Sequence, residues 1–407
     1  MKVIKGGVTA AKGFKAACAE ANIKYKNRTD MAMVYSETPC ECAGTFTTNV
    51  VKAACVQWDQ KVVYSGEPMQ AVVVNSGIAN ACTGKEGFDA CEATAKAVEK
   101  ELGIPYTNVA VASTGVIGMQ LPVEKLVNGV AAMSKTLDDS LEAGTAAAKA
   151  IMTTDTIHKE VAVAFEIAGK TVTLGGMSKG SGMIHPNMCT MLGFITTDAV
   201  ITKEALTKAL KEDVVDTFNM ISVDGDTSTN DTLLIMANGM AENPEIKVDT
   251  PEYEEFKAAL HYVNETLAKM MAGDGEGATA LLEVKVTNAD TKENARTLSK
   301  SVVCSSLVKA MIYGHDANAG RILCALGYSG VQFNPEKIDL YFESEAGKIK
   351  IYEDGVSTGY DETVATTILS EAEVTVLVDM KMGNETATAW GCDLTYDYVK
   401  INADYRS

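Results

Sequence analysis

The 407-residue sequence predicts a fold of the α/β or α+β class, in which sheets and helices are layered around a mixed β-sheet. Strand-like and helical segments alternate between residues 70 and 152, and amphipathic helices are followed by further strands in the second half. The composition agrees with a folded chain, because 46% of the residues are apolar and only 22% are charged. At this length we expect two or more packed units, since single cores rarely grow beyond about 250 residues.

The first half of the chain has the pattern of a β-α-β unit followed by helices. Apolar runs at residues 70–77 and 108–114 are typical of strands, and the stretch between them, 89–103, has a helical pattern that ends at a glycine. Two further helices are predicted at 122–135 and 137–152. This alternation is the main evidence for the α/β class.

A hairpin and a buried strand are predicted in the middle of the chain. Residues 160–176 alternate in polarity and turn at 168–170, which predicts a β-hairpin. Residues 178–199 hold glycines and a proline before an apolar run, so they predict a loop that enters a buried strand. A helix cannot run through this segment.

The second half is predicted to be α/β as well. Its helical patterns give way to strand-rich sequence towards the end of the chain. Helices are expected at 203–222, 251–271, 292–314 and 319–330, and strands at 373–383 and 387–401.

Charge and hydropathy exclude several classes of partner. The formal net charge of -18 repels phosphate backbones and anionic lipids, so we expect neither nucleic acid nor membrane as a partner. The longest apolar runs fall far short of the roughly 20 residues of a membrane span. Residues 1–26 contain scattered lysines and no apolar core of a secretory signal, so a cytoplasmic location is expected. The ten cysteines are too dilute for a disulfide framework, and we expect buried thiols and no metal.

Two glycine-containing segments resemble ligand loops only superficially. Residues 176–182 lack the spacing of a phosphate-binding loop, and the sequence then runs into Pro186 instead of a helix. Residues 224–231 begin like a calcium loop, but Thr229 and Ile235 stand where glycine and glutamate are required. Neither a nucleotide site nor a calcium site is predicted.

Thr190 is a candidate nucleophile because it stands at the mouth of the predicted buried strand, after the small residue Cys189. Its hydroxyl could attack the carbonyl of Cys189 and cut the chain. The new α-amine, with a pKa of roughly 7.7 to 8.0, would then act as a base for the hydroxyl of Thr190. An alternative nucleophile is the thiol of Cys189, paired with His185. His185 itself is more typical of a hydrogen-bonded structural residue than of a catalytic base.

Residues 179–199 resemble the cleavage segment of the ornithine acetyltransferase (glutamate N-acetyltransferase) family of arginine biosynthesis. The resemblance extends along essentially the whole chain, which makes it specific although each motif is short. The supporting stretches are GVTAAKGFKAA, VVNSGIANACTG, ASTGVIG, IMTTDT, SVDGDTSTNDT, GDGEGAT and INADYRS.

The resemblance implies a fold of the ornithine acetyltransferase type and an autocatalytic cut into an α chain, residues 1–189, and a β chain, 190–407. The N-terminal nucleophile would carry acetyl from N-acetylornithine to glutamate in a ping-pong cycle. No cofactor is implied, although some members also use acetyl-CoA as a co-substrate and are multifunctional. We further expect a heterotetramer of two α and two β chains.

Carried over by motif, Thr190 is the nucleophile, and Thr114 and Gly115 form the oxyanion hole. Each donor of such a hole contributes roughly 3 to 4 kcal/mol in comparable enzymes. A lysine beside the nucleophile suits the α-carboxylate that both substrates share. The resemblance implies as substrate-binding residues Thr153, Lys179, Thr190, Glu276, Asn402 and Ser407. Read without the family, Glu276 is only a helix-end charge on a solvated face.

The chain departs from the family pattern in several motifs. Cys189 replaces the usual alanine before the nucleophile, which bears on the efficiency of cleavage. The other departures, which we expect to affect the pocket or its packing, are Ile78, Ala280, Ala317 and Ala319. Two alternatives to the acetyltransferase stay open: an amidohydrolase or aminopeptidase on the same self-cleaving scaffold, and an uncleaved, non-catalytic relative.

Overall fold

The computed structural model describes residues 1–185 and 191–404. The chain forms two compact units, and each contains segments from both sides of residue 190. Unit 1 comprises Met1–Gly180, Pro186–Phe218 and Thr227–Leu267, and unit 2 comprises Ser181–His185, Asn219–Asp226 and Ala268–Ser407. The expected cut between residues 189 and 190 therefore does not coincide with a boundary between packed units.

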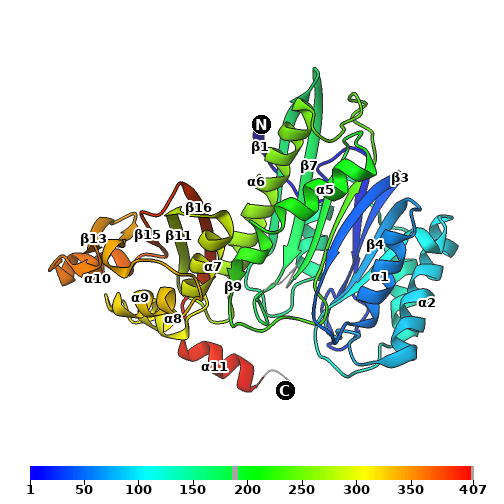
Figure 1. Cartoon of the computed structure of the whole chain (residues 1–407). Coiled ribbons are helices and arrows are strands. Elements are labelled where there is room, and N and C mark those ends of the chain that lie inside the picture. Colours follow the sequence, from blue (N-terminus) through cyan, green and yellow to red (C-terminus); the bar gives the residue numbers. More distant parts are fainter. Residues whose placement is uncertain (186–190, 405–407) are drawn as a thin grey trace. The chain divides into compact units, whose positions relative to one another are not determined.

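Unit 1 is built on a nine-stranded mixed sheet with the order β1-β6-β7-β8-β10-β3-β4-β5, in which β2 also pairs with β3 (Figure 1). The strands are β1 (Lys2–Ile4), β2 (Phe14–Ala19), β3 (Met31–Phe46), β4 (Met69–Asn75), β5 (Val109–Ser113), β6 (Lys159–Ile167), β7 (Lys170–Lys179), β8 (Leu192–Thr197) and β10 (Thr232–Ala237). The helices are α1 (Ala54–Tyr64), α2 (Gly84–Leu102), α3 (Val123–Met133), α4 (Leu141–Ala150), α5 (Lys203–Asp213) and most of α6 (Pro251–Gly273).

The β-α-β unit predicted from the sequence is confirmed. Strands β4 and β5 are parallel, and α1 and α2 pack against each other and against β5 (Figure 1). Helix α2 ends where Gly103 adopts φ +73°, a left-handed conformation that favours glycine. The predicted hairpin is also present, because β6 and β7 are antiparallel and Ala168 and Gly169 form their turn with positive φ.

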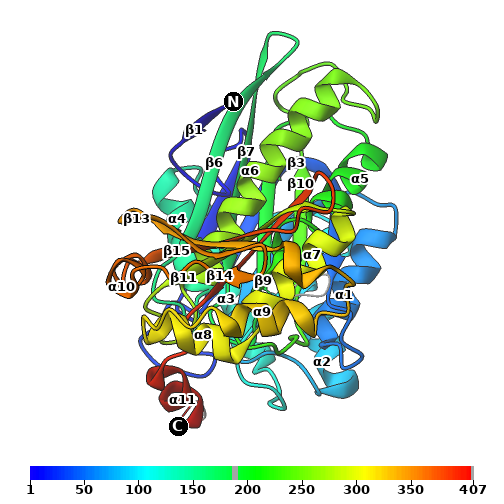
Figure 2. The same ribbon diagram turned by 60° about the vertical axis from the view of Figure 1, so that its left-hand side comes forward.

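Strand β8 is the buried strand predicted after the glycine-rich segment. All six of its residues are buried. It pairs antiparallel with β7 and parallel with β10, so it lies in the interior of the sheet. Helix α6 covers this region, since Phe256 packs on Phe165 of β6 and both views show the helix beside β7 (Figures 1 and 2).

Unit 2 has a seven-stranded sheet with the order β14-β13-β12-β15-β11-β16-β9. Its strands are β9 (Ile221–Ser222), β11 (Leu281–Ala289), β12 (Asp339–Ser344), β13 (Gly347–Glu353), β14 (Val356–Ser357), β15 (Glu373–Asp379) and β16 (Glu385–Cys392). Its helices are α7 (Lys292–Val303), α8 (Ser306–Tyr313), α9 (Gly320–Gly327), α10 (Glu362–Leu369) and α11 (Tyr396–Ala403). The helix α7 packs on β11 and β16.

Three predicted boundaries in the second half are wrong. The helix expected at 203–222 ends at Asp213, and Ile221–Ser222 instead pairs with β16 as strand β9. The helix expected at 292–314 is two helices, since Ser305 caps a new one. The strand expected at 387–401 ends at Cys392, after which Thr395 caps the helix α11 by accepting from the N–H of Tyr398.

The nine described cysteines are free. Five are buried, as predicted, but Cys82 and Cys324 are exposed, so the expectation of buried thiols is wrong for these two. Within residues 1–185 and 191–404, no helix is both long and apolar enough to span a membrane.

Candidate active site

Three of the predicted site residues, Thr190, Cys189 and Ser407, lie outside the described residues. The residues that follow Thr190 are firmly held. Met191 accepts a hydrogen bond of 2.8 Å at its carbonyl from the N–H of Thr232, and Leu192 begins β8. Lys179, the last residue of β7, stands opposite Leu192 in the sheet. The sheet therefore places a lysine beside the strand that begins two residues after Thr190.

Thr114 and Gly115 directly follow β5 and are partly exposed. Gly115 has φ +129°, and a Cβ atom there would lie 2.3 Å from the carbonyl carbon of Gly77. Only glycine permits this close approach of two backbone segments. The turn is fixed on both sides, because the N–H of Thr114 donates to Asn75 and that of Val116 donates to Gly77.

The carboxylate of Asp155 organises two of the predicted substrate-binding residues. Its Oδ2 accepts from the N–H of Thr153 at 2.9 Å and lies 3.8 Å from Nζ of Lys179. Its Oδ1 accepts from Nζ of Lys159 at 2.8 Å and from the N–H of Gly180 at 2.7 Å. Both side chains of the Asp155–Lys159 pair are completely buried. Thr153 and Lys179, 26 positions apart in the sequence, are thus brought together by one carboxylate.

The charge state of Asp155 follows from these contacts. Burial alone raises the pKa of a carboxyl group, but the charges of Lys179 and Lys159 outweigh burial and hold the pKa of Asp155 well below its usual range. Asp155 is therefore ionised at neutral pH. The sequence contained a signal for it, since Asp155 belongs to the motif IMTTDT together with Thr153.

In unit 2, Glu276 and Asn402 contact each other. Nδ2 of Asn402 donates to Oε2 of Glu276 at 2.7 Å, and the N–H of Glu276 donates to the carbonyl of Ser181. Glu276 is only 6% exposed, so its interpretation as a charge on a solvated face is wrong. A Cβ on Gly182 would lie 2.3 Å from the Glu276 carboxyl carbon, which shows how closely the glycine-rich segment packs on it.

His185 has structural contacts. Its Nδ1 lies 3.1 Å from Oγ of Ser222 and 3.5 Å from Sγ of Cys304. Burial, together with the charge of Lys300, lowers the pKa of His185 to about 4. The imidazole is therefore neutral at pH 7.

This lowered pKa predicts a specific loss of stability in acid. The unfolded chain, where the histidine pKa is about 6.5, takes up a proton before the folded chain does, so the stability contribution of neutral His185 is lost as the pH falls from about 6.5 to about 4. His185→Gln cannot titrate. We therefore compare the melting temperatures of the natural protein and of this variant. The difference, natural protein minus variant, should fall when the pH is lowered from 7 to 4.5. Thermal unfolding at both pH values measures the difference, and a constant difference would contradict the prediction.

The departures from the family pattern are mostly buried. Ile78 is 2% exposed and pairs with Thr114 and Val116 in isolated bridges, so it packs directly behind the Thr114 turn. In unit 2, Ala280, Ala317 and Ala319 are buried as well. Their effect on the pocket or on its packing stays a prediction.

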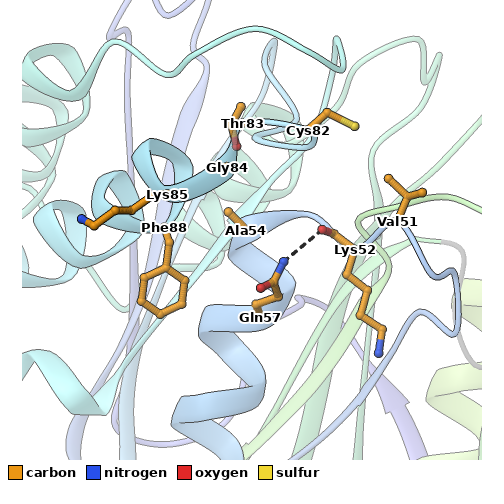
Figure 3. A pocket seen from close by; sticks show the side chains of 9 residues that line it. All are labelled: Val51, Lys52, Ala54, Gln57, Cys82, Thr83, Gly84, Lys85 and Phe88. Carbon is orange, nitrogen blue, oxygen red and sulfur yellow. Dashed lines mark hydrogen bonds between the residues drawn. The ribbon is translucent and has the colours of Figure 1, made fainter.

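A pocket of about 300 Å³ lies where the helices α1 and α2 begin (Figure 3). It contains none of the predicted site residues. Its two lysines do not converge on a common point, since the amine of Lys85 forms an ion pair with Asp89 and the side chain of Lys52 extends to the other side (Figure 3). We assign no role in catalysis to this pocket.

The ArgJ family model matches residues 15–407 of this sequence. The chain belongs to the ArgJ family. This match confirms the resemblance seen in the sequence motifs. Members of this family are acyltransferases of arginine biosynthesis, and this chain is therefore such an acyltransferase.

Two relatives with the family name match all or nearly all of the chain. The arginine biosynthesis bifunctional protein ArgJ of Caldanaerobacter subterraneus subsp. tengcongensis is 51% identical over 407 residues, 100% of both chains. The protein of the same name from Thermotoga neapolitana is 50% identical over 397 residues, 97% of this chain and 99% of the relative. The crystal structure of the Bacillus halodurans protein is 49% identical with a TM-score of 0.50, and the match covers 52% of this chain and 97% of that chain.

Proposed function

We propose that this enzyme transfers an acetyl group from N-acetylornithine to glutamate through an acetyl ester on Thr190. Membership of the ArgJ family supports the reaction class. The observation that carries the assignment of the site is the position of Lys179, beside the start of β8 and next to the Asp155 carboxylate. Both substrates carry an α-carboxylate, for which a buried lysine is a charge-assisted anchor.

The enzyme first has to create its own nucleophile. The Thr190 hydroxyl attacks the carbonyl carbon of Cys189, the peptide C–N bond breaks in an N-to-O shift, and water hydrolyses the resulting ester. The products are a carboxylate on Cys189 and a free α-amine on Thr190. The solved relative from Bacillus halodurans supports such a cut, because nearly all of that chain is matched by about half of this one.

In the acylation step, the α-amine of Thr190 accepts the proton of its own hydroxyl, and the oxygen attacks the acetyl carbonyl of N-acetylornithine. Amide or hydroxyl donors of Thr114 and Gly115 stabilise the tetrahedral anion. The C–N bond then breaks, and the proton passes from the Thr190 amine to the departing amine of ornithine. The enzyme now holds the acetyl group as an ester.

In the second step, the α-amine of glutamate attacks the ester carbonyl, and the C–O bond between the acetyl group and Thr190 breaks. The proton released by the attacking amine passes through the Thr190 α-amine to the Thr190 oxygen, so the hydroxyl is restored and N-acetylglutamate leaves. Thr153 and Lys179 are proposed to bind the carboxylate of each amino acid in turn. Glu276, oriented by Asn402, is proposed to face the amino group that leaves or attacks. Ser407 completes the proposed set through the INADYRS motif.

The test is an assay with N-acetylornithine labelled in the acetyl group. We expect labelled N-acetylglutamate to appear only when glutamate is present. Release of free labelled acetate instead of N-acetylglutamate would favour the amidohydrolase. A single uncut band on a denaturing gel, together with no transfer, would favour the non-catalytic relative.

We further propose that acetyl-CoA is a second acetyl donor and that no cofactor is needed. The word bifunctional in the names of the relatives supports a second donor. Thiol release from acetyl-CoA in the presence of glutamate tests it. A cytoplasmic enzyme of two α and two β chains is proposed as well, and native mass spectrometry should then detect particles of four chains.

A further inference from the structure

The motif SVDGDTSTNDT has no part in the chemistry described so far, although its residues pack against the candidate oxyanion hole. Asn230, within this motif, is 6% exposed. Its Nδ2 donates to the carbonyl of Ser113 at 2.8 Å and also to the carbonyl of Ala79. Ser113 directly precedes Thr114.

The second acceptor, Ala79, connects Asn230 to the other end of the same turn. The N–H of Ala79 donates to the carbonyl of Val116 at 3.0 Å, and Val116 directly follows Gly115. The amide of Asn230 therefore holds the Thr114–Gly115 turn from both sides: directly through Ser113, and through Ala79 on the side of Val116.

The orientation of this amide is set by its neighbour. Oγ1 of Thr229 donates to Oδ1 of Asn230 at 2.7 Å. Because Oδ1 accepts this hydrogen bond, the NH₂ group is directed towards the two carbonyls. An asparagine suits this position because it provides two donors and one acceptor on a short side chain.

The same segment also holds the residue that follows the nucleophile. Two residues after Asn230, the N–H of Thr232 donates to the carbonyl of Met191, and Oγ1 of Thr232 donates to the carbonyl of Asn230. Residues 230–232 thus contact the oxyanion turn at one end and the start of the nucleophile strand at the other.

We propose that Asn230 is a positioning residue that fixes the Thr114–Gly115 turn relative to the start of strand β8, an inference that rests on the roles proposed for Thr190, Thr114 and Gly115. An oxyanion hole works only when its donors lie about 2.7–3.1 Å from the developing anion. A displacement of about 1 Å can lower the rate about 10²-fold.

The decisive variant is Asn230→Asp, which keeps the shape but changes the donors. An ionised carboxylate would repel the carbonyls of Ser113 and Ala79, and a protonated one has a single proton for two acceptors. We expect kcat to fall about 10²-fold, with little change in KM for N-acetylornithine. The residual activity should decrease as the pH rises and the introduced carboxyl ionises, a pH profile that loss of folding alone would not produce.

The matched control is Asn243→Asp. Asn243 is buried to 5% exposure in the same unit, and its Nδ2 likewise donates to two carbonyls, those of Val200 and Pro244. Its contacts are remote from the Thr114 turn, so kcat should be unchanged. Equal losses of kcat in the two variants would overturn the inference.

A burst experiment with p-nitrophenyl acetate separates this inference from the proposed function. The burst of p-nitrophenol reports acetylation of Thr190 without either natural substrate. The natural enzyme and Asn243→Asp should give equally fast bursts, and that of Asn230→Asp should be about 10²-fold slower. A burst without transfer to glutamate would refute the proposed substrates only, and equal bursts in all three proteins would refute the role of Asn230.

A second variant guards against a folding defect. Asn230→Ser retains one hydroxyl donor, so its burst rate should lie between those of the natural enzyme and Asn230→Asp. The initial rate of each burst is divided by the burst amplitude, because the amplitude counts only folded molecules that become acetylated. The result is a rate per active molecule. If rates per active molecule are unchanged in both Asn230 variants, Asn230 serves folding alone.

Discussion

Thr190→Ala should remain a single chain of 407 residues and should show no acetyl transfer. Without the hydroxyl, neither the N-to-O shift at Cys189 nor the acetyl ester can form, and we expect activity to fall by at least about 10³-fold. Denaturing gel electrophoresis and the labelled-acetyl assay measure the two effects. Thr190→Ser, which keeps a hydroxyl, should still be cut and should retain activity.

A control at the neighbouring position distinguishes the two candidate nucleophiles. Cys189→Ala removes the thiol but keeps a small residue before the cut. It should leave cleavage and transfer nearly intact, and N-terminal sequencing of the released chain should begin Thr-Met-Leu-Gly. Loss of all activity in Cys189→Ala would assign the chemistry to the thiol.

Asp155→Asn should combine a large loss of stability with weaker substrate binding. The change removes the carboxylate from the completely buried Lys159 and from Lys179. Breaking a buried ion pair in this way costs about 3–5 kcal/mol of unfolding free energy. Because Thr153 and Lys179 lose their common partner, KM should rise for both substrates. Chemical denaturation and steady-state kinetics measure the two effects.

The pH dependence of this variant follows from the lowered pKa of Asp155. The carboxylate stabilises the folded chain above the unfolded pKa of about 3.9, and this contribution is lost as the pH falls further. The difference in unfolding free energy between the natural protein and Asp155→Asn should therefore have its largest value at pH 7 and become smaller in strong acid. A difference that stays constant down to pH 2 would contradict the ion pair.

Asp59→Asn is the matched control within unit 1. Asp59 is also completely buried, but burial raises its pKa well above the usual value and its Oδ1 accepts from the N–H of Val111. Because burial disfavours the charged form of Asp59, replacing it by an amide of the same shape should remove less charge stabilisation than Asp155→Asn removes. The loss of stability should therefore be smaller, and a loss as large as that of Asp155→Asn would contradict this difference between the two carboxyl groups.

Local patterns predicted most of the fold. Residues 70–114 and the hairpin at 168–170 carry strong periodicity and turn signals, and the structure confirms both. The errors occur where contacts between segments distant in the sequence determine the secondary structure. Ile221–Ser222 continues a helical pattern but pairs with β16, more than 160 residues away in the sequence. The strand predicted at 387–401 also included the first residues of helix α11, which begins after the cap residue Thr395.

The site was only partly visible in the sequence. The family motifs contain Lys179, Thr153 and Asp155, but no local pattern indicated that the side chain of Asp155 contacts the other two residues. Asn230 belongs to the calcium-like loop and to the motif SVDGDTSTNDT, but neither pattern indicates its contact with Ser113, which spans 117 positions. Such contacts depend on the pairing order of the strands, which local periodicity does not encode.

Strand β8 joins the two chains that the proposed cut would produce within one sheet. Strands β1 to β7 come from residues 1–189, and β8 and β10 come from 190–407, yet β8 pairs with β7 and β10 pairs with β3 in one sheet. Cutting the peptide bond breaks none of these ladders. Expressed as separate gene products, the two halves would each expose unpaired strands from the interior of the sheet, and we expect them to aggregate. Two separately purified halves should therefore fail to reconstitute the enzyme on simple mixing.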